Sequence, residues 1–242
     1  MPQPILRVLG PHPEFSLTEK SVLMAPELAV LMAWVVSSSS YLDTMLGRSL
    51  AELLGTTAEI GITMYQALRS SSAQDAVLRA AASKKLTGED IDLFTILLEL
   101  MDSVTERRNK VVHGLWGFSS KRTDLLVWIP PETYLQWHLE GAERERLEAM
   151  GNRGPTRAGV GLDSVKVYGH ADFKNIGDRL LQVTGYFQQF WAFAGSGYAS
   201  PAEARRQLST VKEIQARLSH IEKKRQDALD SPARRPNKDR ST

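Results

Sequence analysis

The chain has 242 residues, of which 42% are hydrophobic and 24% charged, and it contains no cysteine. These values fit one globular domain with appendages, and they exclude disulfide frameworks and thiolate metal sites. The formal net charge of +2 is too small to indicate nucleic-acid binding from overall charge alone.

The start of the chain predicts neither a secretory signal nor a membrane anchor. Residues 1–17 contain four prolines and lack a charged start followed by an apolar core, so we expect an extended lead-in. The most apolar run, residues 22–36, is interrupted by Pro26 and Glu27 and is shorter than the roughly 20 residues of a membrane span. We therefore predict a cytoplasmic protein that does not enter a membrane.

Residues 18–195 predict an all-α domain, a helical bundle with one small β-hairpin. Apolar residues recur at helical spacing from Leu28 onward, and Pro26 fits the first turn of that helix. The four serines at residues 37–40 indicate either a bend or a small-residue segment inside a longer helix. Two further helices are expected over residues 56–68 and 69–86.

The next helix is expected to be the centre of the bundle. Acidic residues at positions 89 and 90 follow a Thr-Gly turn, which is a typical N-terminal signal. Apolar residues then cover a wide arc of the helix as far as Val104, and a helix of that kind is central in its bundle. The pattern ends at Gly114, beyond Arg107, Arg108 and His113.

After Gly114 the pattern changes to short β-prone runs. We expect a β-hairpin near residues 115–129, which either walls the preceding helix end or packs its aromatic side chains on the bundle. A polar helix over residues 132–150, a flexible loop over 151–161, a short extended piece at 165–168 and a buried helix over 172–194 follow.

The last segment predicts a helix over residues 201–229 and a disordered basic tail over 230–242. From residue 201 onward, eleven Lys and Arg stand against six Asp and Glu, a net of +5, which leaves about −3 for the rest. Leu208, Val211, Ile214, Leu218 and Ile221 form a narrow apolar stripe, close to a coiled-coil seam. The partner of this stripe is the same domain, a second copy or another protein.

The candidate site lies where the central helix ends. Asn109 and His113 are four residues apart and share one face, and Arg108 lies about 100° round the helix from Asn109. Arg binds phosphate bidentately and His transfers protons, so this set suits phosphate chemistry. The alternative is that these side chains only cap the last helical carbonyls, with Gly114 after them.

The pattern Arg108-Asn109-x-x-x-His113 resembles the signature of HEPN domains, an Arg and a His near the end of a long helix. The resemblance covers the helices between residues 21 and 116 and the later helices that would complete the bundle. It implies a metal-independent endoribonuclease that cleaves single-stranded RNA by attack of the ribose 2′-OH. Arg108 would bind the scissile phosphate, His113 would act as general acid or base, and Asn109 would orient His113 or the phosphate.

The same resemblance implies further contacts and partners. Arg107 is an alternative motif arginine, and Arg107, Lys110 and Trp116 are the expected substrate-binding residues. Two motifs usually face each other across a homodimer, and members of the family often act as toxins or in antiviral defence, some with an antitoxin partner. We expect no metal and no cofactor. The alternative is a non-catalytic helical scaffold that binds nucleic acid or a partner protein, for example through the C-terminal helix.

Overall fold

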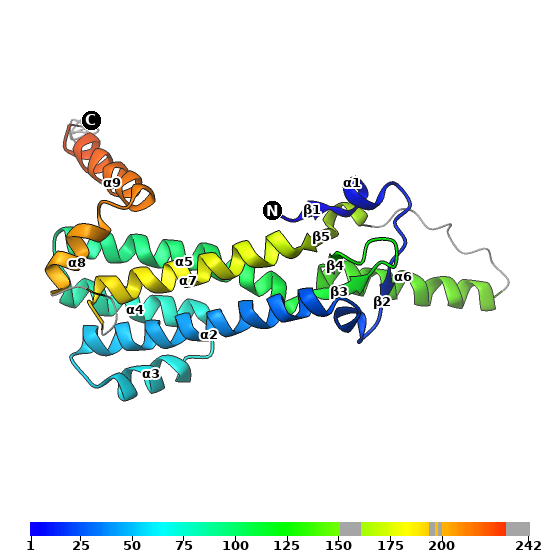
Figure 1. Cartoon of the computed structure of the whole chain (residues 1–242), viewed down its shortest axis with the longest axis horizontal. Helices are drawn as coiled ribbons and strands as arrows, with labels where there is room; N and C mark the ends of the chain where they lie inside the picture. Colours follow the sequence, from blue (N-terminus) through cyan, green and yellow to red (C-terminus); the bar gives the residue numbers. More distant parts are fainter. Residues whose placement is uncertain (151–160, 194–196, 198–199, 231–242) are drawn as a thin grey trace, which may run out of the picture. The chain divides into compact units, whose positions relative to one another are not determined.

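The computed structural model describes residues 1–150, 161–193, 197 and 200–230, and it is predominantly α-helical, as the sequence predicted. Figure 1 shows the elements in chain order, and the bounds of the described elements are as follows. They are β1 Gln3–Pro4, α1 Ile5–Leu9, β2 Ser16–Leu17, η1 Ser21–Met24, α2 Pro26–Leu54, α3 Ala58–Ala67, α4 Ser71–Lys85, α5 Glu89–His113, β3 Leu115–Phe118, β4 Leu125–Ile129, α6 Pro131–Ala149, η2 Leu162–Ser164, β5 Lys166–Gly169, α7 His170–Phe190, α8 Pro201–Leu208 and α9 Lys212–Asp230.

The chain divides into two compact units. Unit 1 comprises residues 1–43 and 101–184, and unit 2 comprises residues 44–100 and 185–242. The predicted loop at 151–161, except Gly161, and the predicted tail beyond residue 230 lie outside the described residues. The candidate motif belongs to unit 1, so this unit is the one that positions the site.

Helix α2 settles the question raised by the four consecutive serines. The helix is continuous from Pro26 to Leu54, so the serines are a small-residue segment inside a longer helix. Ser38 and Ser39 are buried. In unit 1, the ring of Trp34 lies so close to α7 that a Cβ on Gly177 would come within 2.4 Å of it.

The hairpin is part of a larger sheet. Strands β3 and β4 pair antiparallel, and the full order is β1-β5-β4-β3-β2, with every neighbour antiparallel. The N-terminal lead-in is therefore not simply extended. It supplies both edge strands and the short helix α1, whose Ile5 N–H donates to the Val165 carbonyl at 3.0 Å.

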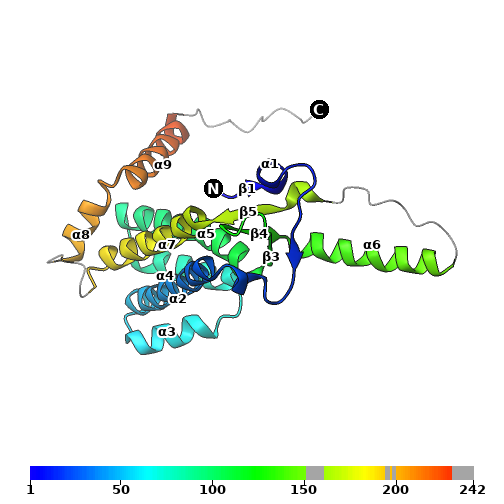
Figure 2. The same ribbon diagram turned by 45° about the vertical axis from the view of Figure 1, so that its right-hand side comes forward.

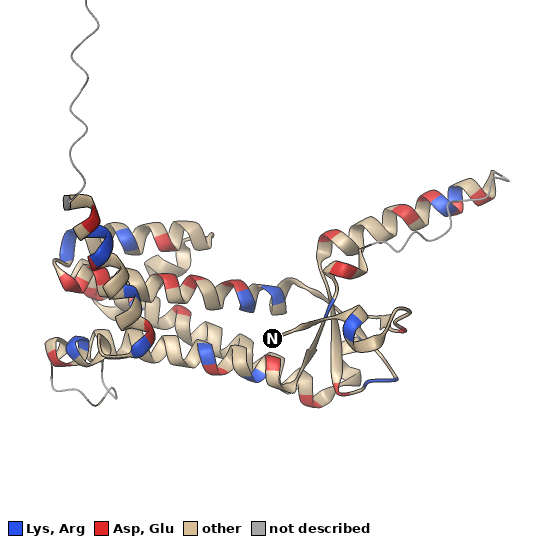
Figure 3. Cartoon of the chain, turned by 90° about the horizontal axis from the view of Figure 1, so that it is seen from above, with Lys and Arg blue, Asp and Glu red and all other residues tan. Residues whose placement is uncertain are grey.

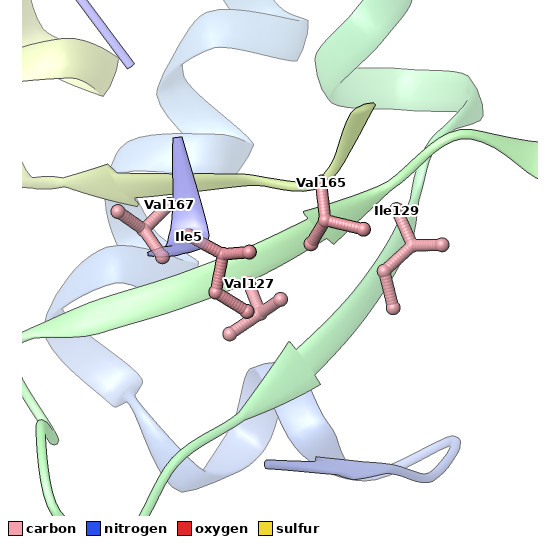
Figure 4. Packing of buried hydrophobic residues seen from close by; sticks show 5 residues of the cluster. All are labelled: Ile5, Val127, Ile129, Val165 and Val167. Carbon is pink, nitrogen blue, oxygen red and sulfur yellow. The ribbon is translucent and has the colours of Figure 1, made fainter. Parts of the chain in front are cut away.

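One face of the sheet carries a small aliphatic core. Figure 4 shows its five buried residues, Ile5, Val127, Ile129, Val165 and Val167. Tyr134 and Trp137 of α6 pack against it. Figures 1 and 2 show the rest of α6 running away from the sheet, and Figure 3 shows residues of both charges along it. The sheet thus holds only the first part of α6.

The other face of the sheet holds the end of α5. Trp116 and Trp128 lie directly opposite each other in the β3–β4 ladder. The Trp128 indole N–H donates to the Lys110 carbonyl at 2.6 Å, and the Trp116 indole N–H donates to the Val111 carbonyl at 3.1 Å. The last four carbonyls of a helix have no partner within it. The two indoles cap two of these carbonyls in α5, and the Gly114 N–H also donates to the Lys110 carbonyl at 3.2 Å.

Position 114 has room only for glycine, because the indole of Trp128 lies against its Cα atom. Its φ is not positive, and a Cβ built on it would lie 1.7 Å from the Trp128 indole nitrogen. Any larger residue would push Trp128 away from the helix end. The prediction that the helix ends at Gly114 is confirmed. The glycine is required there because strand β4 brings Trp128 against it.

Unit 2 has its own aromatic and aliphatic core. Phe94 of α5 contacts the rings of Phe187, Phe190 and Trp191, with centroid distances of 5.3–6.0 Å. Gly61 of α3 packs on α2, because a Cβ there would lie 2.5 Å from that of Ala51. Close helix packing around a buried ring cluster therefore defines this unit.

The C-terminal segment forms two helices, α8 and α9, where the sequence predicted one. Leu208 and Ile214 are fully buried, so the first half of the predicted stripe packs within unit 2. Ion pairs fix both helices to acidic residues of α5. They are Arg205–Asp90 at 2.5 Å, Arg217–Glu99 at 2.7 Å and Arg225–Asp92 at 2.6 Å.

We expect the change Gly114→Ala to destabilise the protein by about 2–4 kcal/mol, because it overpacks Trp128 and breaks its bond to the Lys110 carbonyl. Urea unfolding followed by far-UV circular dichroism measures the loss. Gly141→Ala in α6 is the matched control, since a Cβ there meets nothing within 4 Å. It should be neutral or stabilising by up to about 1 kcal/mol. Equal stability of Gly114→Ala and wild type would disprove the steric role.

We expect Phe94→Ala to destabilise the protein by about 3–5 kcal/mol, because it removes a fully buried ring from a three-ring contact. The control is Leu229→Ala in α9, whose side chain is 79% exposed and should change stability by less than about 0.5 kcal/mol. Thermal unfolding of both variants separates a core role of Phe94 from a peripheral one.

Candidate functional site

The last turn of α5 places the motif side chains at different depths. His113 and Arg107 are exposed, whereas Arg108, Asn109 and Lys110 are half-buried. Val111, between them, is buried and anchors the turn to unit 1. The motif therefore has one exposed side chain, His113, and two half-buried ones, Arg108 and Asn109.

Arg108 is held on that border by a neighbouring amide. Its Nη1 donates to Asn109 Oδ1 at 2.9 Å. Arg108 and His113 are five residues apart, or about 140° round the helix, so their side chains leave in different directions. Asn109 lies on the face of His113, and its bond to Arg108 draws the guanidinium toward that face.

A second charge lies inside the unit near this arginine. Asp43 of α2 is half-buried. Burial raises the pKa of Asp43, and the nearby positive charge of Arg108 opposes that rise. The Arg108 Nε atom is itself buried and has no hydrogen-bond partner among the described residues. The guanidinium is thus buried on its inner side, near an acid, and bonded to Asn109 on its outer side.

His113 is accessible for proton transfer. It is exposed, and its side chain makes no hydrogen bond or ion pair within the described residues. The alternative reading of the sequence, in which Arg108 and His113 serve only to cap helical carbonyls, does not describe this turn. The indoles of Trp116 and Trp128 perform the capping, and Arg108 bonds a side chain.

The other two basic residues of the turn differ in their availability. The Lys110 Nζ lies 2.7 Å from Glu106 Oε1, and this hydrogen bond lowers the pKa of the Glu106 carboxyl. Lys110 would have to exchange Glu106 for a phosphate in order to bind substrate. Arg107 is exposed and has no ion pair within the described residues, so it can meet an anion directly.

The side chain of Trp116 is packed inside unit 1 and contacts other residues of the protein. Besides capping Val111, its ring packs on Tyr168 and Phe173 at centroid distances of 5.2 and 5.5 Å. Burial, together with the nearby negative charge of Asp172, raises the pKa of Tyr168 to about 12, so its hydroxyl is neutral at ordinary pH. Of the two roles considered for the hairpin, packing its aromatics on the helices is the one that Trp116 performs. A stacking contact with RNA bases stays a prediction.

Two surface hollows lie on unit 1 away from the motif. One, of about 390 Å³, is lined by residues of η1, the start of α2, the β3–β4 turn and His170. The other, of about 260 Å³, lies along α6. Neither is lined by a motif residue, so the candidate site is identified by the motif residues Arg108, Asn109 and His113 and not by a cavity. Within the described residues, no cluster of three or more His, Asp or Glu side chains suits a metal ion.

Sequence reasoning missed two residues that shape this site. Trp128 was recognised only as part of a β-prone run, although its alternation with Val127 and Ile129 places it on the opposite face of the strand. Asp43 carried no signal, since a lone acid within an apolar helical pattern has no visible partner in sequence. Comparison of the chain with protein-family models, curated proteins and solved structures found no match.

Proposed function

We propose that the protein is a metal-independent endoribonuclease of HEPN type that cleaves single-stranded RNA through attack of the ribose 2′-OH. The observation that carries the proposal is the exposed imidazole of His113, on the same helix face as Asn109, whose Oδ1 accepts a hydrogen bond from the Arg108 guanidinium. A cytoplasmic role as a toxin or antiviral effector, in some cases with an antitoxin, belongs to the same proposal and rests on resemblance alone.

The rigidity of the helix end supports a catalytic use. Acid–base and electrostatic catalysis both need groups that are fixed before the substrate arrives. The two indole caps and the buried Val111 fix the backbone that carries Arg108, Asn109 and His113. The remaining freedom is in the side chains, of which His113 is exposed and Arg108 and Asn109 are half-buried.

The proposed step is a transesterification. The 2′-oxygen forms a bond to phosphorus, the bond from phosphorus to the 5′-oxygen breaks, and the products are a 2′,3′-cyclic phosphate and a 5′-OH. His113 takes the 2′-OH proton or gives a proton to the 5′-oxygen. Arg108 stabilises the charge on the non-bridging oxygens. Because one motif supplies one imidazole, a second copy would supply the other proton-transfer group.

A binding protein is the second candidate. The inner side of the Arg108 guanidinium is buried, and the charge of Asp43 lies near it. A cation that is partly balanced inside the protein can still hold a phosphate but stabilises its developing charge less. In this alternative the motif binds nucleic acid or a partner protein without cleaving.

We expect the wild type to cleave labelled single-stranded RNA in EDTA and to leave cyclic-phosphate ends. His113→Ala should lower the rate by about 10²–10⁴-fold, the usual contribution of general acid–base catalysis. Arg108→Ala should lower it by about 10²–10³-fold, because it removes the charge stabilisation. End-group analysis on denaturing gels measures both effects.

Two controls make this assay specific. Val112→Ala changes an exposed residue of the same turn that has no role in the proposed chemistry, and it should retain full activity. RNA with 2′-O-methyl groups should resist cleavage, since it lacks the attacking hydroxyl. A folded wild type that binds RNA but does not cleave it would favour the second candidate.

A further inference from the structure

A hollow lies along one side of helix α6. Its volume is about 260 Å³, and it is lined by Tyr134, Trp137, His138, Gly141, Ala142 and Glu145. These positions recur at intervals of three and four residues, so they share one face of the helix over about 17 Å. We call these six residues the α6 groove.

The end of the groove nearest the sheet is aromatic and held in place. Tyr134 and Trp137 pack against the aliphatic core of the sheet. The rings of Tyr134 and His138 contact each other edge to face, with a centroid distance of 4.4 Å. The rings are therefore ordered before any ligand arrives, which lowers the entropic cost of binding. The faces of Tyr and Trp rings attract cations.

The other end of the groove is acidic. Glu145 lines it, and Glu148, three residues later, lies on the same face. Both are exposed, and neither makes an ion pair within the described residues. The helix contains five glutamates and two arginines, a net of −3, and Figure 3 shows them in red and blue. Because the C-terminal end of a helix is the negative end of its dipole, these carboxylates lie where a helix favours cations.

Gly141 lies in the middle of the groove, at a position where the fold does not require a glycine. Its φ is not positive, and a Cβ built on it meets nothing within 4 Å. Glycine weakens the interior of a helix, and here neither a turn nor close packing within the chain calls for it. Its effect is to open a space between the aromatic rings and Glu145 in which a ligand can approach the helix backbone.

We propose that the α6 groove binds an arginine side chain of a partner protein. The guanidinium lies over Gly141, between the rings of Trp137 and His138 on one side and the carboxylate of Glu145 on the other. Helical side chains lean toward the N-terminus of their helix, which brings the Glu145 carboxylate over the turn that contains Gly141. A planar guanidinium stacks on aromatic rings and bonds a carboxylate through two N–H groups, whereas an ammonium is a point charge.

Apolar surface beside the groove extends the contact. Leu135 and Leu139 are 59% and 64% exposed, and they lie next to the side of the groove that Ala142 forms. A leucine next to the arginine in the partner can pack there. The partner sequence that fits is therefore basic and amphipathic, with arginine and leucine alternating with small residues.

Size and charge argue against two other kinds of occupant. The hollow is smaller than the roughly 300–1,000 Å³ of pockets that enclose a small-molecule ligand, so one side chain of a larger partner fits it better. The exposed carboxylates of Glu145 and Glu148 repel phosphate groups, which disfavours RNA. The proposal does not rest on ribonuclease activity.

Titration of the ¹⁵N-labelled full chain with the peptide acetyl-Ala-Leu-Arg-Ala-Leu-Arg-Ala-amide tests the proposal. Backbone amide resonances of residues 134–145 should shift, with a dissociation constant on the order of 0.1–1 mM. The same peptide with lysine in place of arginine should bind about 5–10-fold more weakly. With citrulline, which keeps the shape of arginine without its charge, binding should be weaker by about 10-fold or more.

Three variants test the groove itself. Glu145→Gln removes one charge at constant shape and should weaken binding of the arginine peptide by about 5–10-fold. The matched control is Glu143→Gln, which removes the same charge about 160° round the helix and should change binding by less than about 2-fold. Gly141→Leu fills the hollow and should abolish binding with an unchanged circular dichroism spectrum, because leucine favours helix more than glycine does.

Several outcomes would overturn the proposal. They are the absence of shifts at about 5 mM arginine peptide, shifts confined to residues outside α6, and equal binding of the arginine and citrulline peptides. Equal effects of Glu145→Gln and Glu143→Gln would also overturn it, because they would reduce the interaction to the net charge of the helix. Single-stranded oligouridine is expected to leave the α6 resonances in place, and shifts with oligouridine alone would assign the groove to nucleic acid.

Discussion

The hydrogen bonds from two indole N–H groups to the end of α5 determine how unit 1 presents its motif. Trp116 and Trp128 are cross-strand partners, so one pair of strands delivers both donors to adjacent carbonyls, those of Val111 and Lys110. A helix end in water would fray, since its last carbonyls lack partners. Here indole N–H groups of the sheet donate to carbonyls that water would otherwise bind. Gly114 allows this approach because it has no Cβ to displace the Trp128 ring.

The sheet can hold the helix end only because both of its faces are covered. The aliphatic cluster around Val127 and Ile129 covers one face. On the other face, Trp128 bonds to the end of α5 and Tyr168 packs on Phe173 of α7. The N-terminal residues close the sheet, because they supply both edge strands and Ile5. A proline-rich segment that looked like a simple lead-in therefore forms both edges of the sheet that contacts a motif about 100 residues later.

The sequence predicted the parts of the fold that follow from local periodicity. The wide apolar arc of α5, its acidic start and its stop at Gly114 were all visible, and so was the β3–β4 hairpin. The sequence could not predict which strands and side chains from distant parts of the chain come together. The joining of β1, β2 and β5 to the hairpin, and the proximity of Asp43 to Arg108, depend on how the chain folds back on itself. The break between α8 and α9 was hidden because the apolar stripe continues through residues 208–214 without losing its spacing.

At the candidate site, spacing predicted the shared face of Asn109 and His113 but not the direction of Arg108. That direction follows from burial on one side and a hydrogen bond on the other. Val104 and Val111 define the core side of α5, and Arg108 lies beside it, so its stem packs inward while Asn109 draws its head group outward. Spacing could not predict either contact, because both depend on how unit 1 packs around the end of α5.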